Sequence, residues 1–318
     1  MKSTFIVILL MIQAIAAWAN NGFNITWQKL PSMPQALSGH MSVWHDGELL
    51  VIGGTNWNDG NKSTFADVWA YSPQYQSWQQ KTSLPQPIAY GAAKSTFTGL
   101  TIYGGWDDGN ALQATYSLDE NNRWQQSDDL LLPLAYSAVE VVDNSTYLFG
   151  GAADLADAKT YNAFLWKKSA NSWAKISSLP KPCALLASAS TQHGIYIFGG
   201  MNLKKGKVHN LSNAWFYDIK KNTWKALRHL PIAARGMAAC AISERYILLA
   251  GGYSDTFLNQ VLLYDIQKNS YSQLTPLPYA ASGMQMVYIN NCVYVMGGED
   301  APRHRSDLFF VGQVNNLS

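Results

Sequence analysis

One short segment of the chain concentrates side chains able to transfer protons and to bind an anion. The segment GGEDAPRHRSDLFF begins at Gly297 and places five such residues within seven positions: Glu299, Asp300, Arg303, His304 and Arg305. A carboxylate beside two guanidiniums suits the binding of an acidic substrate together with proton transfer. A solvated loop of ion pairs without a chemical role is the alternative interpretation. The residues of this segment leave both interpretations open.

Other polar side chains suited to substrate binding are scattered along the chain. Asn56 and Lys62 belong to one polar segment, and Arg235 directly precedes Gly236. Tyr90 and Tyr136 occupy two equivalent segments, where packing or hydrogen bonding is an equally good explanation. We expect Asn56, Lys62, Tyr90 and Arg235 to bind substrate together with Arg303.

The sequence lacks the usual motifs of metal, nucleotide or serine-nucleophile chemistry. Histidines stand at positions 40, 45, 193, 209, 229 and 304, without the spacing of metal ligands. The glycine pairs lack the strand–GxGxxG–helix context, and no GxSxG turn occurs. Cys183, Cys240 and Cys292 are widely spaced, so we expect buried small side chains with at most one disulfide. The sequence therefore predicts no cofactor and no metal.

Composition and the first residues bear on partners and location. The 318 residues carry a net charge of +2 with 14% charged and 13% aromatic residues, typical of a folded chain that binds neither nucleic acid nor an anionic membrane. Lys2, an apolar run over 5–17 and Ala17-Trp18-Ala19 resemble an export signal. We expect residues 1–19 to be a signal peptide cleaved after Ala19, and residues 20–318 to be periplasmic. The alternative, an uncleaved membrane anchor, has an apolar run too short for a stable span.

Two sequence markers repeat with one shared period. The first is a glycine pair after a short apolar run: Gly53-Gly54, Gly104-Gly105, Gly150-Gly151, Gly199-Gly200, Gly251-Gly252 and Gly297-Gly298. The second is an aromatic residue that opens a segment ending at proline: Trp27, Trp78, Trp124, Trp173, Trp224 and Tyr271. Successive glycine pairs are 51, 46, 49, 52 and 46 residues apart. A shared period of this length indicates a repeat architecture.

Each repeat is expected to form four short strands, with a polar loop after the glycine pair. The glycines permit close approach between repeats, and the aromatic side chains fill the wedge between them. This pattern predicts an all-β, six-bladed β-propeller of kelch type that makes residues 20–318 one domain. Residues 23–30 supply only the outer strand of a blade, so we expect the N-terminal strand to complete the last blade.

In such a propeller, the loops after the glycine pairs and the proline-containing loops between blades emerge on one face. A ligand site is therefore expected at the channel mouth on that face, built from several blades. The loop from Gly297 concentrates charge as none of the other five loops does.

The mature chain resembles the kelch-propeller N-acetylneuraminate epimerases, or sialic acid mutarotases, of bacteria, and in particular their circularly permuted branch. The resemblance rests on GGTNWNDGNK from Gly53, YGAAKSTFTG from Tyr90 and GGEDAPRHRSD from Gly297. The family has a Gly-Glu loop with an arginine six positions after the glutamate, followed by a small hydroxyl residue. Glu299, Arg305 and Ser306 match this pattern. The resemblance implies that Glu299 and Arg305 are the catalytic pair and that the substrate is a small acidic sugar, N-acetylneuraminate.

Two other functions remain open from the sequence. One is a non-catalytic kelch propeller that binds a glycan or a protein partner, in which the charged loop has only a binding or structural role. The other is a mutarotase that acts on a different acidic sugar.

Overall fold

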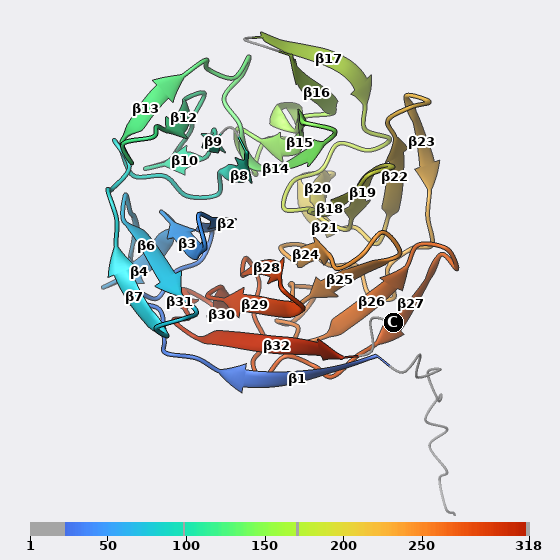
Figure 1. Ribbon diagram of the computed structural model, residues 1–318. Helices are drawn as coiled ribbons and strands as arrows, with labels where there is room; N and C mark the ends of the chain where they lie inside the picture. Colours follow the sequence, from blue (N-terminus) through green and yellow to red (C-terminus); the bar gives the residue numbers. More distant parts are fainter. Residues whose placement is uncertain (1–22, 98, 170–171, 316–318) are drawn as a thin grey trace, which may run out of the picture.

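The structure is a computed structural model that describes residues 23–97, 99–169 and 172–315. Six four-stranded antiparallel sheets surround a central axis, as Figure 1 shows. The prediction of an all-β six-bladed propeller is therefore confirmed. The signal peptide predicted for residues 1–19 lies outside the described residues.

Each blade runs from an inner strand at the axis to an outer strand at the rim. The first three blades are β2 (Met41–His45), β3 (Glu48–Ile52), β6 (Val68–Ser72), β7 (Ser77–Gln80); β8 (Ala92–Thr96), β9 (Gly99–Tyr103), β12 (Thr115–Leu118), β13 (Trp124–Ser127); β14 (Ala135–Val142), β15 (Ser145–Ala152), β16 (Phe164–Ser169), β17 (Ser172–Ser178). The last three are β18 (Ala187–Thr191), β19 (Gly194–Phe198), β22 (Ala214–Asp218), β23 (Thr223–Ala226); β24 (Ala238–Ala241), β25 (Tyr246–Ala250), β26 (Val261–Asp265), β27 (Ser270–Gln273); β28 (Gln285–Ile289), β29 (Cys292–Met296), β32 (Phe309–Asn315), β1 (Asn24–Lys29).

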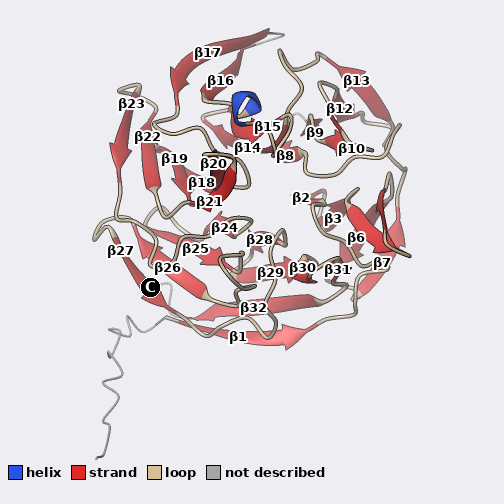
Figure 2. Ribbon diagram, turned by 180° about the vertical axis from the view of Figure 1, so that it is seen from behind, coloured by secondary structure: helices blue, strands red, loops and turns tan. Residues whose placement is uncertain are grey.

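The sixth blade joins the two ends of the described chain. Strand β1 pairs with β32 over six residues, with Ile25 opposite Val314 and Trp27 opposite Gly312. The two strands lie side by side in both views (Figures 1 and 2). This confirms the predicted closure, with three strands from one end and one from the other. The pairing covers the sheet edge that β32 would otherwise expose.

The glycine pairs connect each blade to the next. Both glycines of every pair have positive φ, such as 58° at Gly53 and 108° at Gly54. The second glycine donates its N–H to a carbonyl of the following blade's loop, from Gly54 to Ile88 at 2.9 Å and, across the closure, from Gly298 to Leu37 at 2.8 Å. A Cβ on Gly53 would lie 2.1 Å from the Ile88 oxygen, so only glycine fits.

The repeated aromatic residues connect each outer strand to the preceding blade. Trp78 Nε1 donates to the Pro31 carbonyl at 3.1 Å, and Trp124 Nε1 donates to the Thr82 carbonyl at 3.0 Å. Trp27 makes the same contact to Thr275 across the closure. The indole of Trp173 is buried, but its Nε1 has no hydrogen-bond partner among the described residues. These rings combine apolar packing between blades with a polar contact at the rim.

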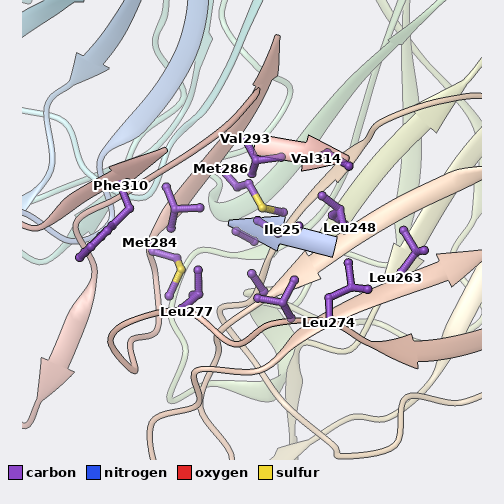
Figure 3. Close-up of a cluster of buried hydrophobic side chains, with 14 of the residues drawn as sticks. Ile25, Leu248, Leu263, Leu274, Leu277, Met284, Met286, Val293, Phe310 and Val314 are labelled. Carbon is purple, nitrogen blue, oxygen red and sulfur yellow. The ribbon is translucent and has the colours of Figure 1, made fainter. Parts of the chain in front are cut away.

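The hydrophobic core is divided into clusters between neighbouring blades. Figure 3 shows one of them, where Ile25 and Val293 of the sixth blade face Leu248 and Leu263 of the fifth. Burying a side chain of this kind stabilises the fold by about 1.5–3 kcal/mol. The closing strand β1 thus contributes apolar contacts as well as backbone pairing.

Four of the six segments after the glycine pairs form short hairpins, where the sequence predicted only polar loops. These are β4 (Thr55–Asn58) with β5 (Asn61–Thr64), β10 (Trp106–Asp107) with β11 (Asn110–Ala111), β20 (Met201–Lys204) with β21 (Lys207–Asn210), and β30 (Glu299–Ala301) with β31 (His304–Arg305). Tight turns such as Asp59-Gly60 and Asp108-Gly109 adopt positive φ at both residues. Turns of this kind match the twist of paired strands, which explains the hairpins.

Helical structure is almost absent from the described ranges, whose only helical segment is the 3-10 turn η1 (Ala158–Thr160), drawn in blue in Figure 2. Within those ranges no helix has the length and apolar character needed to cross a membrane. Cys183, Cys240 and Cys292 are all free; Cys183 is buried and the other two are partly buried.

Candidate functional site

A closed ring of backbone hydrogen bonds surrounds the propeller axis at the start of the inner strands. It contains one residue at the start of each blade, in the loop before the inner strand or, for Tyr136, in β14 itself. Each member donates its N–H to the preceding one: Gly39, Tyr90, Tyr136, Leu185, Gly236 and Gly283. All six adopt the left-handed conformation, with φ between 52° and 67°. We call this feature the axial ring. It holds the six interblade loops at fixed positions around the channel mouth.

The loops after the glycine pairs emerge at the same end as the axial ring. In each case, a residue of an interblade loop pairs with a residue that follows a glycine pair, as in Ser38 with Thr55, Arg235 with Tyr253 and Ser282 with Glu299. These pairings confirm the expectation that both sets of loops share one face. Side chains from different blades therefore meet around the mouth.

Glu299 and Arg305 face each other on the hairpin of β30 and β31. The two residues are direct cross-strand partners, and Arg305 Nη1 lies 2.8 Å from Glu299 Oε1. The backbone N–H of Arg303, in the turn of the hairpin, donates to the same carboxylate oxygen at 3.2 Å. Because Glu299 and Arg305 are six residues apart, a short hairpin places their side chains opposite each other.

Burial distinguishes the two members of this ion pair. The Arg305 side chain is 4% exposed and the Glu299 side chain 33% exposed. The Nε and Nη1 of Arg305 are both buried without a hydrogen-bond partner among the described residues, so the 2.8 Å contact of Nη1 with Glu299 is an ion pair without hydrogen-bond geometry. The carboxylate is therefore the more accessible member of the pair, and the guanidinium lies behind it.

Arg303 and Arg235 bring two further guanidiniums to the region. Arg303 is exposed and lies over the Trp57 ring of the first blade, 5.1 Å from its centroid. Arg235 is partly buried, donates to Asn210 Oδ1 at 2.7 Å and lies 4.5 Å from the centroid of Tyr253.

The negative charge of Glu299 also acts electrostatically on Arg235. Burial lowers the pKa of the Arg235 guanidinium, and the negative charge of Glu299 opposes that shift. The carboxylate therefore has a cation on the neighbouring fifth blade as well as on its own hairpin.

Lys62 and Tyr90 meet in an aromatic cluster on the first two blades. Lys62 Nζ lies 4.6 Å from the centroid of Tyr90 and 4.3 Å from that of Trp106. Tyr90 in turn packs against Tyr136 with ring centroids 4.7 Å apart. Cation–π contacts of this kind fix the direction of a flexible lysine. The structure thus brings these two predicted site residues into contact.

Tyr136 and Tyr161 lie near each other, and they interact electrostatically with Tyr90 and Arg235 respectively. Burial raises the pKa of Tyr161 to about 12, with Asp154 adding to the shift and Arg235 opposing it. The pKa of Tyr136 is also raised, chiefly by burial and further by Tyr90 and Asp154. Both phenols are therefore neutral at pH 7, and the Tyr161 hydroxyl donates to the Leu155 carbonyl at 3.0 Å.

Asn56 lies on β4, in the same hairpin as Lys62 and close to β31, which carries Arg305. Its Oδ1 accepts the N–H of Trp57 at 2.7 Å, a local contact within the first hairpin.

Sequence reasoning missed Tyr161, Asn210 and Tyr253. A usable signal existed for Tyr253, because it directly follows a glycine pair in the same position as Trp106 and Glu299. No group of three or more His, Cys, Asp or Glu side chains in the described ranges is placed to hold a metal ion.

Known proteins with similar sequences have kelch repeats. Beta-scruin of Limulus polyphemus is 27% identical over 229 residues, covering 68% of this chain and 24% of that protein. Kelch domain-containing protein 1 of Mus musculus is 30% identical over 123 residues, covering 37% of this chain and 30% of that protein. The chain thus matches only about a quarter to a third of the length of these curated relatives.

A solved structure and a family model agree on the architecture. The structure of YjhT aligns with a TM-score of 0.75 and 14% sequence identity, covering 90% of this chain and 99% of YjhT, which is a likeness of fold. The sequence model of the KLHDC2/KLHL20/DRC7 Kelch-repeats domain matches residues 132–298, just over half of the chain. Together with the six glycine-paired blades, this match shows that the chain belongs to the kelch-repeat β-propeller family.

Proposed function

We propose that the chain is a mutarotase that interconverts the α and β anomers of N-acetylneuraminate, with Glu299 as the group that moves the proton. The observation that carries this proposal is the partly exposed carboxylate of Glu299, held 2.8 Å from a buried guanidinium on one hairpin of the loop face. The choice of sugar rests on the resemblance of the segment from Gly297 to the N-acetylneuraminate epimerases.

The reaction needs one proton acceptor and one proton donor at the same centre. Ring opening removes a proton from the anomeric hydroxyl, forms the carbonyl, breaks the bond to the ring oxygen and delivers a proton to that oxygen. Closure on the other face of the carbonyl reverses these steps. Because no net proton or electron is consumed, a single carboxyl group that relays through water serves both directions.

The arginines divide their roles according to burial. Arg305 is too buried for extensive contact with a sugar, and its ion pair with Glu299 suits it to orient that carboxylate. Arg303 and Arg235 are the more accessible guanidiniums, and either suits the substrate carboxylate or developing negative charge. Lys62 and Tyr90, with Asn56 on the same hairpin as Lys62, are proposed to contact the remainder of the sugar.

The test is the rate of anomer exchange, followed by proton NMR after a single anomer is dissolved. Wild-type protein is expected to accelerate exchange in proportion to its concentration, and Glu299→Gln to return it to the spontaneous rate. Asp300→Asn is the matched control, because Asp300 lies on the same hairpin but pairs with His304 and not with an arginine. Equal rates with wild-type protein, Glu299→Gln and no protein would refute the enzyme proposal.

A second candidate is a propeller that binds a glycan without changing it. The partly buried aromatic cluster of Tyr90, Trp106 and Tyr136 favours this alternative, because the open part of an aromatic face can stack on a sugar ring. It predicts saturable binding of the sugar without any acceleration of exchange.

The proposed location is the periplasm. It rests on the leader sequence, and an N-terminus at Asn20 in the exported protein, read by mass spectrometry, would support it.

A further inference from the structure

Two adjoining cavities lie inside the channel, beyond the axial ring from the proposed sugar site. The cavity nearer the ring has a volume of about 210 Å³, and the further one about 280 Å³. Both are lined by the inner strands and share Lys94, Glu140 and Ser188. The further cavity extends to Trp44 and Tyr288, near the ends of their strands that point away from the ring. Its outer end therefore faces the side of the propeller opposite Glu299.

A buried carboxylate stands between the two cavities with its acceptors already engaged. Glu140 on β14 receives hydrogen bonds at 2.8 Å from Lys94 Nζ on β8 and from the hydroxyls of Ser188 and Ser190 on β18. The Glu140 side chain is 6% exposed, whereas that of Lys94 is 33% exposed. Among the described residues that line the two cavities, only Lys94 and Glu140 have a basic or acidic side chain. A molecule in the channel therefore meets more of the ammonium group than of the carboxylate.

Further hydrogen-bond donors in the cavity walls have no partner. The hydroxyls of Ser42 and Ser137 are buried, and neither finds a hydrogen-bond partner among the described residues. Both line the cavity nearer the ring. Burial raises the pKa of the Cys240 thiol to about 12, and Glu140 adds to the shift, so this wall residue is uncharged at pH 7. Unpaired buried hydroxyls are costly unless a ligand or water satisfies them.

We propose that the channel is a second binding site, which takes a small oxyanion such as a carboxylate or a phosphate. Lys94 provides the cation, and its ammonium has two N–H groups left after the contact with Glu140. Ser42 and Ser137 provide neutral donors. Glu140 positions Lys94 and does not itself bind the anion. The site is separate from the Glu299 hairpin and does not depend on the proposed mutarotase activity.

Anion binding in the channel can be followed through the NMR signals of the methionine methyl groups. Met41, Met237, Met284 and Met286 line the cavities. Met33, Met201 and Met296 do not line them and serve as internal controls. Protein labelled with ¹³C at the methionine methyls is titrated with sodium acetate in one experiment and inorganic phosphate in another, at constant ionic strength.

The expected result is a saturable shift of the channel methyls, with the control methyls unchanged. The anion that saturates identifies which oxyanion the site takes. Absence of saturable shifts at the channel methyls with both probes would overturn the proposal and indicate a channel filled only by water.

Two variants distinguish the role of the Lys94 ammonium in anion binding from that of the Glu140 carboxylate. Glu140→Gln keeps Lys94, so the anion is expected to bind as tightly as in wild type or more tightly. Lys94→Met with Glu140→Gln removes both charges together and leaves no unpaired buried carboxylate to impair folding. This double variant is expected to bind at least about tenfold more weakly, the usual effect of losing a charged hydrogen bond. The proposal would be contradicted if the double variant bound the anion as tightly as wild type. It would also be contradicted if Glu140→Gln alone weakened binding as much as the double variant does.

Discussion

Buried His40 is expected to make the stability of the fold depend on pH. The side chain is 1% exposed, and neither ring nitrogen has a hydrogen-bond partner among the described residues. Its ring lies against the backbone of Gly297 and its Cβ against Gly54, between the sixth and first blades. Burial without a partner lowers the pKa of His40 from 6.5 to about 3, because the charged form loses its hydration.

The sign and size of the effect follow from proton linkage. The unfolded chain takes up a proton near pH 6.5, whereas the folded chain does so only near pH 3. The stability that neutral His40 preserves is therefore complete above pH 6.5 and is lost as the pH falls toward 3. At pH 5, the free energy of unfolding is expected to be about 2 kcal/mol lower than at pH 7.5 on account of this residue alone.

Urea unfolding followed by tryptophan fluorescence at pH 7.5 and pH 5 measures this loss. His40→Leu removes the titrating group in an apolar setting and should abolish about 2 kcal/mol of the pH dependence. His229→Leu, at an exposed histidine, should leave the pH dependence of wild type intact. If wild type and His40→Leu lose the same stability between the two pH values, the reasoning about His40 is wrong.

Two further predictions concern the contacts between blades. Gly105→Ala should destabilise the fold by more than about 2 kcal/mol, because a Cβ there would lie 2.5 Å from Ile88 and 2.9 Å from the Ala89 oxygen. Gly109→Ala, also at positive φ but with no atom within 4 Å, should cost only about 1 kcal/mol; equal midpoints of urea unfolding would contradict the close-approach argument. Ile25→Ala on the closing strand should cost about 2–5 kcal/mol, whereas Thr26→Ala at the exposed neighbouring position should change the unfolding free energy by under about 0.5 kcal/mol. Equal stability of these two variants would show that β1 does not seal the last blade.

The sequence predicted the propeller well because its architectural residues recur in every blade. Glycine pairs and outer aromatic residues such as Trp78 act locally, so residue type and period were enough to identify them. The closing role of residues 23–30 followed from the same period. The pairing of Glu299 with Arg305 came from the resemblance of the segment from Gly297, whereas the short hairpin that joins the two residues was not predicted.

Contacts between segments distant in the sequence could not be predicted from residue type and period. Glu140 and Lys94 are 46 residues apart on different inner strands, and nothing in either neighbourhood distinguishes them. Tyr161 reaches the vicinity of Arg235 only through the arrangement of the third and fifth blades. Such pairs depend on the rotation from one blade to the next, which local patterns do not specify.

The most direct test of the account is the slope of the anomer exchange rate of N-acetylneuraminate against protein concentration. A positive slope for the wild-type protein and for Asp300→Asn, with a slope of zero for Glu299→Gln, is the predicted result. A positive slope that Glu299→Gln retains would remove Glu299 from the mechanism, and a slope of zero for the wild type would contradict the proposed activity.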